Sequence, residues 1–315
     1  MPVPIILFVY NRPKHLQQTL NSLKKEKKLS KIYFFIDGPK NDAEKNEINK
    51  CIDIVNKVDW VKKETITQKV NIGLKNTLLI STSHVFEKHN HDFVIFLEDD
   101  NIIQPGFYDY MNLASEKYKT QKKIFSITGY NFILNKDEYK TIIGDHFFLS
   151  YGNTWSLGIW KRSWKLWKKE ILNLDDAPKK KIFKSILKSK NYILYDVLLE
   201  GYIKKNNAGS TYYYTLWKHN KLTIFPKFPL VNNIGMDGSG ENCIISNKFV
   251  NLRRFTRNHK IKIKNQKIKS NDLIKEGIFS YLTISLKKRL FYIFCPIRLQ
   301  IPLLKFYMWA IKKFT

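Results

Sequence analysis

Cysteine and long apolar runs are both scarce in this 315-residue chain. Its three cysteines, Cys51, Cys243 and Cys295, lie far apart and include no CxxC pair. This argues against a disulfide framework or a zinc cluster and fits a reducing cytoplasm. No apolar stretch reaches the roughly 18 residues of a membrane-spanning helix. The apolar run at residues 5–10 is too short, and lacks the preceding basic residues, for a signal peptide. We therefore expect a cytoplasmic protein.

Acidic residues are also few, with 27 against 55 lysines and arginines, which gives a formal net charge of +28. Such an excess predicts attraction to polyanions such as nucleic acid, anionic lipid or phosphorylated substrates. Codon bias toward Lys, Asn and Ile is an alternative explanation. The sequence has no Walker-type glycine-rich loop and no G-x-S-x-G motif. It also lacks an RNP-like aromatic motif, a recognisable helix-turn-helix and a zinc finger, so no nucleic acid is expected as a partner.

The hydrophobic residues that are present, 43% of the chain, alternate between two patterns in the first hundred positions. Continuous apolar runs predict buried strands, and apolar residues spaced by three and four predict amphipathic helices. The strands fall at 5–10, 32–36, 65–70 and 93–97, and the helices at 15–25, 44–58 and 75–89. This order predicts an α/β fold with a mostly parallel sheet flanked by helices and ligands at the carboxyl ends of the strands.

Polar residues follow three of these strands: Asn11 and Arg12, then Asp37, then the triplet Glu98, Asp99 and Asp100. Carboxylates at a strand end suit Mg²⁺ or Mn²⁺ carrying a diphosphate. Because successive side chains of a strand alternate in direction, the three acids cannot all bind one ion. We assign Asp100 to the metal, and Glu98 and Asp99 to the ribose or to holding the ligand. A solvated strand end is the alternative.

Residues 96–108, FLEDDNIIQPGFY, resemble the strand, acidic triplet and continuation of GT-A glycosyltransferases. The resemblance is closest to the N-acetylglucosaminyltransferase I type and to bacterial family 2-like sugar transferases. Segments 4–13, 35–38 (FIDG), 71–74 (NIGL) and 232–240 resemble further family segments in the same order. The match covers roughly residues 1–245.

This resemblance implies a GT-A (Rossmann-like) fold and an inverting transfer from a nucleoside-diphosphate sugar, with UDP favoured, assisted by Mn²⁺ or Mg²⁺. It implies that Asn11, Asp37 and Asn71 hold the nucleoside and that Asp100 binds the metal. Arg12 and Lys75 could reach the diphosphate. Turn formation before Pro or Gly is the alternative for Asn11 and Asn71.

An inverting transfer needs a general base that deprotonates the acceptor hydroxyl. Asp196, in YDVLL, stands where the family has an Asp at the start of a helix, and a helix N-terminus favours the ionised form. Glu200, one turn later, is the substitute, and helix capping is the alternative role for Asp196. Residues 151–160 stand where relatives carry a Trp- and Gly-rich motif lining the sugar site. In the late loop, Asp237 and Asn242 are further candidates for a metal or phosphate contact.

The last part of the chain differs in composition, with 16 Lys and Arg against two acids from Asn251 to Thr315. We predict a glycosyltransferase domain at 1–245, with a nucleotide-binding half (1–123) and an acceptor half (124–245), and a basic helical extension at 246–315. Amphipathic segments in the extension would contact an anionic membrane surface. The alternative is a helical pair packed on the domain.

Together these features favour a peripheral enzyme on the inner face of the cell membrane, acting on a glycan or lipid-linked acceptor in bacterial surface polysaccharide synthesis. The competing hypotheses are a basic nucleic-acid-binding protein and a metal-dependent nucleotidyltransferase. The second would use the same sheet and metal but lacks an N-terminal glycine-rich loop. The histidines show no pair at a metal-binding spacing on a predicted helix.

Overall fold

The computed structural model describes residues 3–26, 28–174, 179–204, 208–239, 253–256, 259–282 and 284–314. Its strands are β1 (Ile5–Val9), β2 (Ile32–Ile36), β3 (Lys63–Thr67), β4 (Phe93–Glu98), β5 (Asn101–Ile103), β6 (Ile124–Thr128), β7 (His146–Leu149), β8 (Leu157–Trp160), β9 (Leu222–Pro226) and β10 (Val231–Asn233). Its α-helices are α1 (Pro13–Leu23), α2 (Asp42–Asn56), α3 (Gly73–Ser83), α4 (Phe107–Lys117), α5 (Lys136–Lys140), α6 (Lys161–Asn173), α7 (Lys180–Lys188), α8 (Tyr192–Ile203), α9 (Ala208–Lys218), α10 (Asp272–Tyr281), α11 (Leu286–Phe294) and α12 (Ile297–Phe314). A π-helix, η1 (His84–Lys88), follows α3.

Eight strands form one mixed sheet in the order β3-β2-β1-β4-β8-β6-β9-β7, and β10 pairs with β5 in a separate antiparallel ribbon. The pairs among β3, β2, β1 and β4 are all parallel. Antiparallel β8 joins this half to β6 and β9, which are parallel to each other. The predicted α/β fold, with a mostly parallel sheet flanked by helices, is confirmed.

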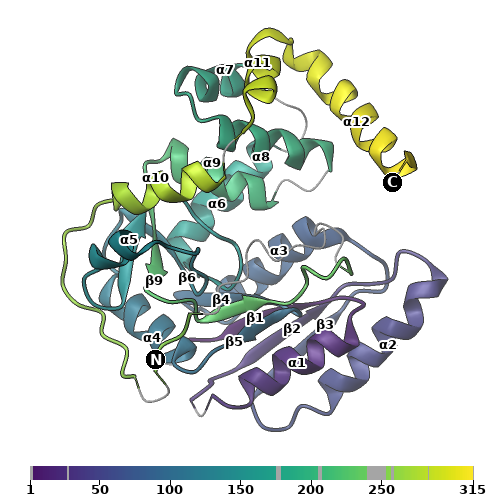
Figure 1. Cartoon of the computed structure of the whole chain (residues 1–315). Helices are drawn as coiled ribbons and strands as arrows, with labels where there is room; N and C mark the ends of the chain where they lie inside the picture. The colour runs from purple at the N-terminus through teal and green to yellow at the C-terminus, as the bar shows by residue number, and fades with distance from the viewer. Residues whose placement is uncertain are drawn as a thin grey trace.

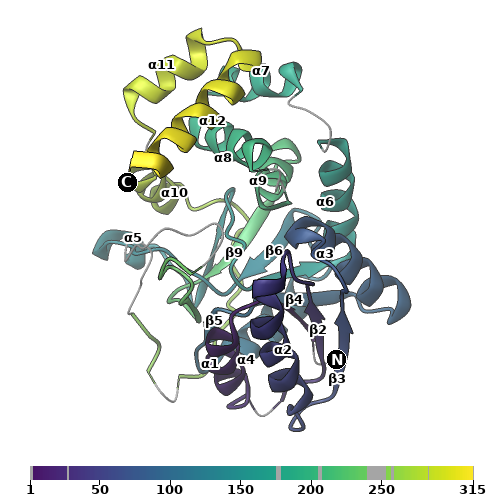
Figure 2. The same cartoon turned by 90° about the vertical axis from the view of Figure 1, so that its right-hand side faces the viewer.

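Helices cover both faces of the sheet, as Figures 1 and 2 show from two directions. Side chains of β1 alternate between the two layers. Ile5 and Leu7 pack with α1, α2 and α4 in one core. Ile6 and Phe8 pack with α3, α6 and α9 in the other. Burial on both faces explains why β1, β2 and β4 have continuous apolar sequences, whereas the partly exposed edge strand β3 does not.

A third cluster consists of helices only and brings the C-terminal extension against the middle of the chain. In it, Phe183 of α7 and Tyr195 of α8 pack near Tyr292 of α11, with ring centroids of Tyr195 and Tyr292 4.7 Å apart. Ile274 and Ile278 of α10 are buried in the core of the sheet domain. The extension is therefore packed on the domain. No helix among the described residues is long and apolar enough to cross a membrane.

His146 in β7 is fully buried, and burial disfavours the protonated, charged form of its imidazole. Its Nε2 lies 2.7 Å from the Tyr118 hydroxyl and 2.8 Å from Nε2 of Gln266. Burial, helped by the nearby charge of Lys117, lowers the pKa of His146 to about 4. The folded chain therefore binds fewer protons than the unfolded chain between pH 6.5 and 4.

We expect the His146 contribution to the free energy of unfolding to be fully present above pH 6.5 and to fall by about 1.4 kcal/mol per pH unit as the pH drops toward 4. The change His146→Gln should remove this slope, whatever its effect on absolute stability. Urea unfolding between pH 4 and 7 measures it. His219→Gln, which changes a partly exposed histidine, is the control and should keep the slope. Equal slopes in both variants would contradict the assignment.

Candidate functional site

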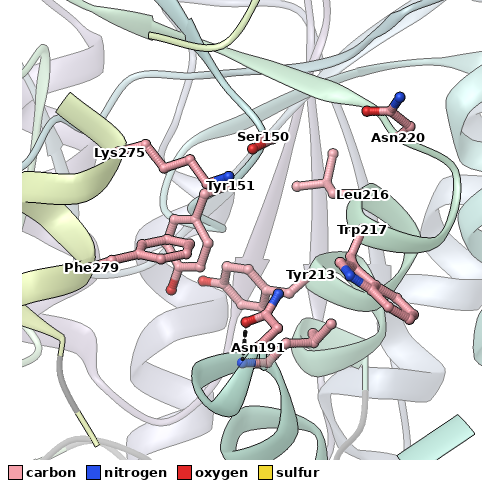
Figure 3. Close-up of a pocket in the computed structure, with 10 residues that line it drawn as sticks. Ser150, Tyr151, Asn191, Tyr213, Leu216, Trp217, Asn220, Lys275 and Phe279 are labelled. Atoms are coloured by element: carbon pink, nitrogen blue, oxygen red, sulfur yellow. Dashed lines mark hydrogen bonds between the residues drawn. The ribbon is translucent and has the colours of Figure 1, made fainter. Parts of the chain in front are cut away.

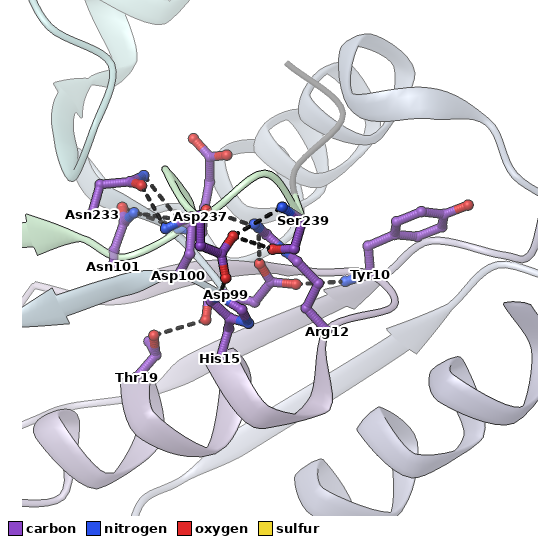
Figure 4. Close-up of polar contacts among 12 residues, drawn as sticks. Tyr10, Arg12, His15, Thr19, Asp99, Asp100, Asn101, Asn233, Asp237 and Ser239 are labelled. Atoms are coloured by element: carbon purple, nitrogen blue, oxygen red, sulfur yellow. Dashed lines mark hydrogen bonds and ion pairs between the residues drawn. The ribbon is translucent and has the colours of Figure 1, made fainter. Parts of the chain in front are cut away.

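The acidic triplet lies where the order of the parallel strands reverses. β1 is flanked by β2 on one side and by β4 on the other, so the loops after β1 and β4 leave in opposite directions. In open α/β sheets this switch point forms a crevice at the carboxyl ends of the strands. The residues after β1 and β4 meet there, as Figure 4 shows. The contact of Arg12 with Asp99 and Asp100 is thus a consequence of the topology.

Arg12 bridges two buried carboxylates. Its Nη2 forms an ion pair with Oδ1 of Asp99 and another, at 2.9 Å, with Oδ2 of Asp100. The two aspartates are only 2% and 3% exposed. Oδ2 of Asp99 also accepts a hydrogen bond from the backbone N–H of Tyr10 at 3.1 Å. Asp99 is therefore engaged in holding the end of β1 and the start of α1 against β4.

Glu98 differs from Asp99 and Asp100 in the contacts of its carboxylate. Its carboxylate has no hydrogen-bonding or ion-pair partner among the residues that the structure describes. Burial, followed by the negative charges of Asp100 and Asp99, raises the pKa of Glu98 to about 8. Burial also raises the pKa of Asp99 to about 6, although Arg12 opposes this. The raised pKa values mean that these carboxyls hold protons in place of a balancing positive charge, and a hard divalent cation would displace the proton of Glu98 and neutralise the group.

Two asparagines that were not predicted as site residues fix the orientation of Asp100. Its Oδ1 accepts hydrogen bonds from Nδ2 of Asn101 at 2.7 Å and from Nδ2 of Asn233 at 3.1 Å. Asn101 and Asn233 face each other in the β5–β10 ladder. Oδ1 of Asn101 accepts from the N–H groups of Glu98 and Ser156, each at 3.3 Å. The available sequence signal was the position of Asn101 next to the triplet and the polar late loop.

The late loop continues from β10 across the triplet. The N–H of Ile234 donates to the backbone oxygen of Asp100 at 2.9 Å. A Cβ on Gly235 would lie 2.1 Å from Oδ2 of Asp100, so this position requires glycine. Oδ2 of Asp237 lies 3.1 Å from Nε2 of His15, which joins the loop to α1. Asn242, predicted for the same loop, lies outside the described residues.

Asp37 and Asn71 meet each other beside this crevice. Oδ1 of Asp37 accepts from the N–H of Ile72 and Oδ2 from the N–H of Gly73, both at 2.9 Å. Nδ2 of Asn71 donates to Oδ2 of Asp37 at 3.1 Å. Asp37 thereby caps the start of α3, where a negative charge is favoured by the helix dipole. Lys75 lies in the first turn of the same helix.

Asn11 and Arg12 line an open cleft of about 630 Å³ between α1 and α2. Nδ2 of Asn11 donates to Oε1 of Glu44 at 3.3 Å, and the other carboxylate oxygen of Glu44 accepts a hydrogen bond from the Tyr10 hydroxyl. Four cationic side chains line the cleft, together with two acidic ones. The cations are Arg12, Lys14, Lys50 and Lys57, and the acids are Glu47 and Asp53. This wall suits an anionic ligand such as a diphosphate.

The structure does not bring the two predicted base candidates to the triplet. Asp196 accepts a hydrogen bond from the Tyr292 hydroxyl and lies 2.7 Å from Nζ of Lys288, both on α11. Glu200 pairs with Lys204 on the same helix at 2.6 Å. Both carboxylates belong to α8, which Figures 1 and 2 show in the upper helical cluster, away from β4 and β5. The contacts of Asp196 join α8 to α11, and a role as the base stays a prediction.

The segment at 151–160 reaches two places. Ser156 contacts Asn101 beside the triplet, as described above. Tyr151 lines a partly open cavity of about 230 Å³ together with Tyr213, Trp217 and Phe279, shown in Figure 3. The rings of Tyr151 and Tyr213 are stacked, with centroids 5.2 Å apart. Aromatic walls of this kind suit the apolar face of a sugar ring, the role predicted for this segment.

Comparisons with known proteins add a partial structural likeness. No family model and no curated protein matches the chain. Among solved structures it is similar to residues 1–349 of TarS from S. aureus, with 13% identity, a TM-score of 0.39 and coverage of 54% of this chain and 50% of that one. It is also similar to the mannosyltransferase PcManGT from Pyrobaculum calidifontis in complex with GDP-Man and Mn²⁺. That match has 12% identity and a TM-score of 0.34, and covers 53% of this chain and 46% of that one.

The chain thus spans about half the length of the structures it resembles. Both likenesses concern the fold alone. At these TM-scores we argue the function from the site itself.

Asp196 provides a test of the role that its contacts indicate. Asp196→Ala leaves the buried hydroxyl of Tyr292 without its acceptor, so we expect the free energy of unfolding to fall by about 1–3 kcal/mol. Glu200→Ala, on the same helix, removes only an exposed pair and should cost less than about 1 kcal/mol. Chemical denaturation compares the two variants. Equal losses would show that the link between α8 and α11 does not stabilise the fold.

Proposed function

We propose that this protein is a glycosyltransferase that uses a nucleoside-diphosphate sugar and a divalent cation bound at the acidic triplet. The observation that supports it most is the carboxylate of Glu98, which lies beside the buried Asp100 and has no partner among the described residues. Glu98 ends β4 and Asp100 lies in the turn that follows, close enough for its charge to help raise the pKa of Glu98. Binding a nucleic acid would not call for such an excess of acid, which repels phosphate unless a cation is present.

The residues of the site divide the work between cation and nucleotide. Asp100 holds Mn²⁺ or Mg²⁺, with Glu98 as the second nearby carboxylate, and oxygen donors of this kind match both ions. A bound cation would neutralise the charge that develops on the departing nucleoside diphosphate. Asp99 keeps Arg12 in place, and Arg12 with the lysines of the adjoining cleft would face the diphosphate.

The nucleoside would lie along the ends of β1 and β2, near Asn11, Asp37 and Asn71. The carboxylate of Asp37 is occupied by the start of α3, so we infer that it acts by positioning Asn71 and the 71–73 turn. UDP is the favoured nucleotide, from the family resemblance. The acceptor would be a hydroxyl of a glycan or of a lipid-linked sugar. Asp196 is the base predicted from the sequence, and its pair with Lys288 would have to open before it took up a proton.

The cation claim is tested by calorimetry with UDP, GDP and CMP, each with and without Mn²⁺. We expect Mn²⁺ to enhance the binding of one nucleotide, and Asp100→Ala to reduce that binding at least about tenfold, because the ion loses a charged ligand. Gly235→Ala should have a similar effect, since the added Cβ would collide with Asp100.

Asp137→Ala is the matched control, because Asp137 is an exposed acid on α5 whose pair with Lys140 is local. It should bind nucleotide as the unaltered chain does. Nucleotide binding that ignores both Mn²⁺ and Asp100→Ala would refute the proposed function.

We also propose that the C-terminal extension rests on an anionic membrane surface. One side of α11 and α12 packs inward through Tyr292 and Gln300, which are 1% and 0% exposed. The other carries exposed apolar side chains, among them Leu286 at 71%, Phe294 at 77% and Phe306 at 65%. Exposed basic residues accompany them: Lys287, Arg298 and Lys305. Apolar and basic groups on one surface are typical of interfacial helices. The two sequence alternatives, packing and membrane contact, are thus compatible.

Sedimentation with phosphatidylcholine vesicles, with and without phosphatidylserine, tests this surface. We expect binding only when phosphatidylserine is present, and at least a tenfold loss in the double variant Leu286→Ser, Phe294→Ser, because burying each side chain contributes about 1.5–3 kcal/mol. Leu172→Ser, at a similarly exposed leucine of α6, should leave binding unchanged. Equal binding by both variants would argue against a membrane role for α11.

A further inference from the structure

A second cluster of ligand-type side chains lies on the far edge of the sheet, apart from the triplet. Glu64 of the edge strand β3 meets His84 of η1 and His89, the residue after η1. Nε2 of His84 lies 2.7 Å from Oε1 of Glu64, and Nε2 of His89 lies 3.1 Å from Oε2. One nitrogen or oxygen atom from each side chain fits within 4.8 Å of the other two. Two imidazoles and one carboxylate therefore lie close enough together to bind one ion.

These separations are close to those of ligands around one metal ion. Zinc binds histidine nitrogen at about 2.0–2.1 Å and carboxylate oxygen at about 2.0–2.2 Å, so two ligands in tetrahedral geometry are about 3.4 Å apart. The observed nitrogen–oxygen distances are 2.7 Å and 3.1 Å. Side-chain shifts of less than about an ångström would complete the geometry. Three protein ligands leave a fourth position for water.

The π-helix explains why the sequence did not indicate this cluster. Residues 75–89 were predicted as one α-helix, in which positions five apart diverge by about 140° around the axis. The structure ends α3 at Ser83 and continues as the π-helix His84–Lys88. Hydrogen bonding between residues five apart brings such positions toward the same side. The structure thus brings His84 and His89 together although their spacing on a predicted α-helix did not indicate it.

The surroundings keep the cluster ordered and accessible. The side chains of His84, His89 and Glu64 are 22%, 24% and 25% exposed, so an ion can enter from solvent. Nζ of Lys31 lies 2.7 Å from Oε2 of Glu64 and orients the carboxylate from outside, as outer partners of metal ligands do. Burial raises the pKa of Glu64, but the hydrogen bonds from Lys31 and His84 outweigh it and hold the pKa at about 2. His91 is adjacent, but its Nε2 lies 3.0 Å from the Tyr33 hydroxyl.

We propose that Glu64, His84 and His89 form a binding site for a zinc-class transition-metal ion, distinct from the hard-cation site at the triplet. Imidazole ligands favour Zn²⁺ over Mg²⁺ or Mn²⁺. An ion here ties the edge strand β3 to η1 and, through it, to α3. Because the ion binds the folded chain only, it stabilises that part of the sheet.

The test is zinc titration of the untagged, chelator-treated chain, followed by calorimetry and by the visible absorption of bound Co²⁺. We expect one ion per chain at this site, and at least a tenfold loss of zinc affinity in His84→Gln and in His89→Gln, because even outer partners of metal ligands change affinity by about 10–100-fold. The Co²⁺ absorption should vanish in both variants. Circular dichroism verifies that the variants are folded.

The chain offers a matched control in a cluster with a single histidine. Glu170 pairs with Lys218 and with His219, each at 2.9 Å, so it has the same charges but one imidazole fewer. His219→Gln should bind zinc as the unaltered chain does, and so should Asp100→Ala. The second control separates this site from the proposed catalytic cation. Zinc binding that is absent from the unaltered chain, or unchanged in both His84→Gln and His89→Gln, overturns the proposal.

Discussion

The guanidinium of Arg12, held between the buried carboxylates of Asp99 and Asp100, is the constraint on which the site depends. Two carboxylates this close and this buried repel each other, and both would be driven to take up protons without a compensating positive charge. Removing one member of such a buried group typically costs about 3–5 kcal/mol, because the remaining charges stay uncompensated. The start of α1 must therefore stay against the end of β4 for the fold to be stable.

Other parts of the molecule are arranged around this charge group. Thr19, about two helical turns after Arg12, donates to the backbone oxygen of Asp99 at 2.8 Å. From the opposite side, Asn233 and the backbone of Ile234 bind Asp100, which brings the β10 strand across β5. The close approach of Gly235 follows from the same contacts. Segments more than a hundred residues apart in the chain thus meet at one pair of carboxylates.

The acids of the site differ in how far the fold itself satisfies them. The Asp37 carboxylate accepts the N–H groups of Gly38, Ile72 and Gly73, and Asp99 accepts the N–H of Tyr10 and binds Arg12. A carboxylate bonded in this way serves the backbone and has little capacity left for a ligand. Glu98 has no such partner in the part of the chain that the structure describes. A search for ligand-binding groups among strand-end acids should therefore start from the acid that the fold leaves unsatisfied, which here is not the one that sequence position alone selects.

The sequence predicted the parallel half of the sheet well, because each of its buried strands is a continuous apolar run followed by a polar residue. It also predicted a ligand site at the carboxyl ends of these strands, where Arg12, Asp37 and the triplet stand, since strand ends in such a sheet share one edge. The contributions of Asn101 and Asn233 depend on the pairing of β5 with β10, which no local pattern encodes. The placement of Asp196 against Lys288 and Tyr292 likewise depends on where the C-terminal extension folds back. Local sequence patterns therefore predicted the strands and their polar ends, but they could not predict contacts between segments that are distant in the chain.

The two clusters of ligand-type residues differ in donor chemistry, and this difference has a physical consequence. The triplet offers oxygen atoms only and lies beside a guanidinium, so a hard ion that shares its coordination with phosphate and water fits it best. The cluster on β3 and η1 offers two imidazole nitrogens, which favour ions toward the zinc end of the first-row series. The clusters also lie at different places on the sheet, one at the switch point beside β1 and β4 and the other at the β3 edge. Because the two sites prefer different ions, a structural ion could bind at the β3 edge of the sheet without competing for the cation site that binds the nucleotide.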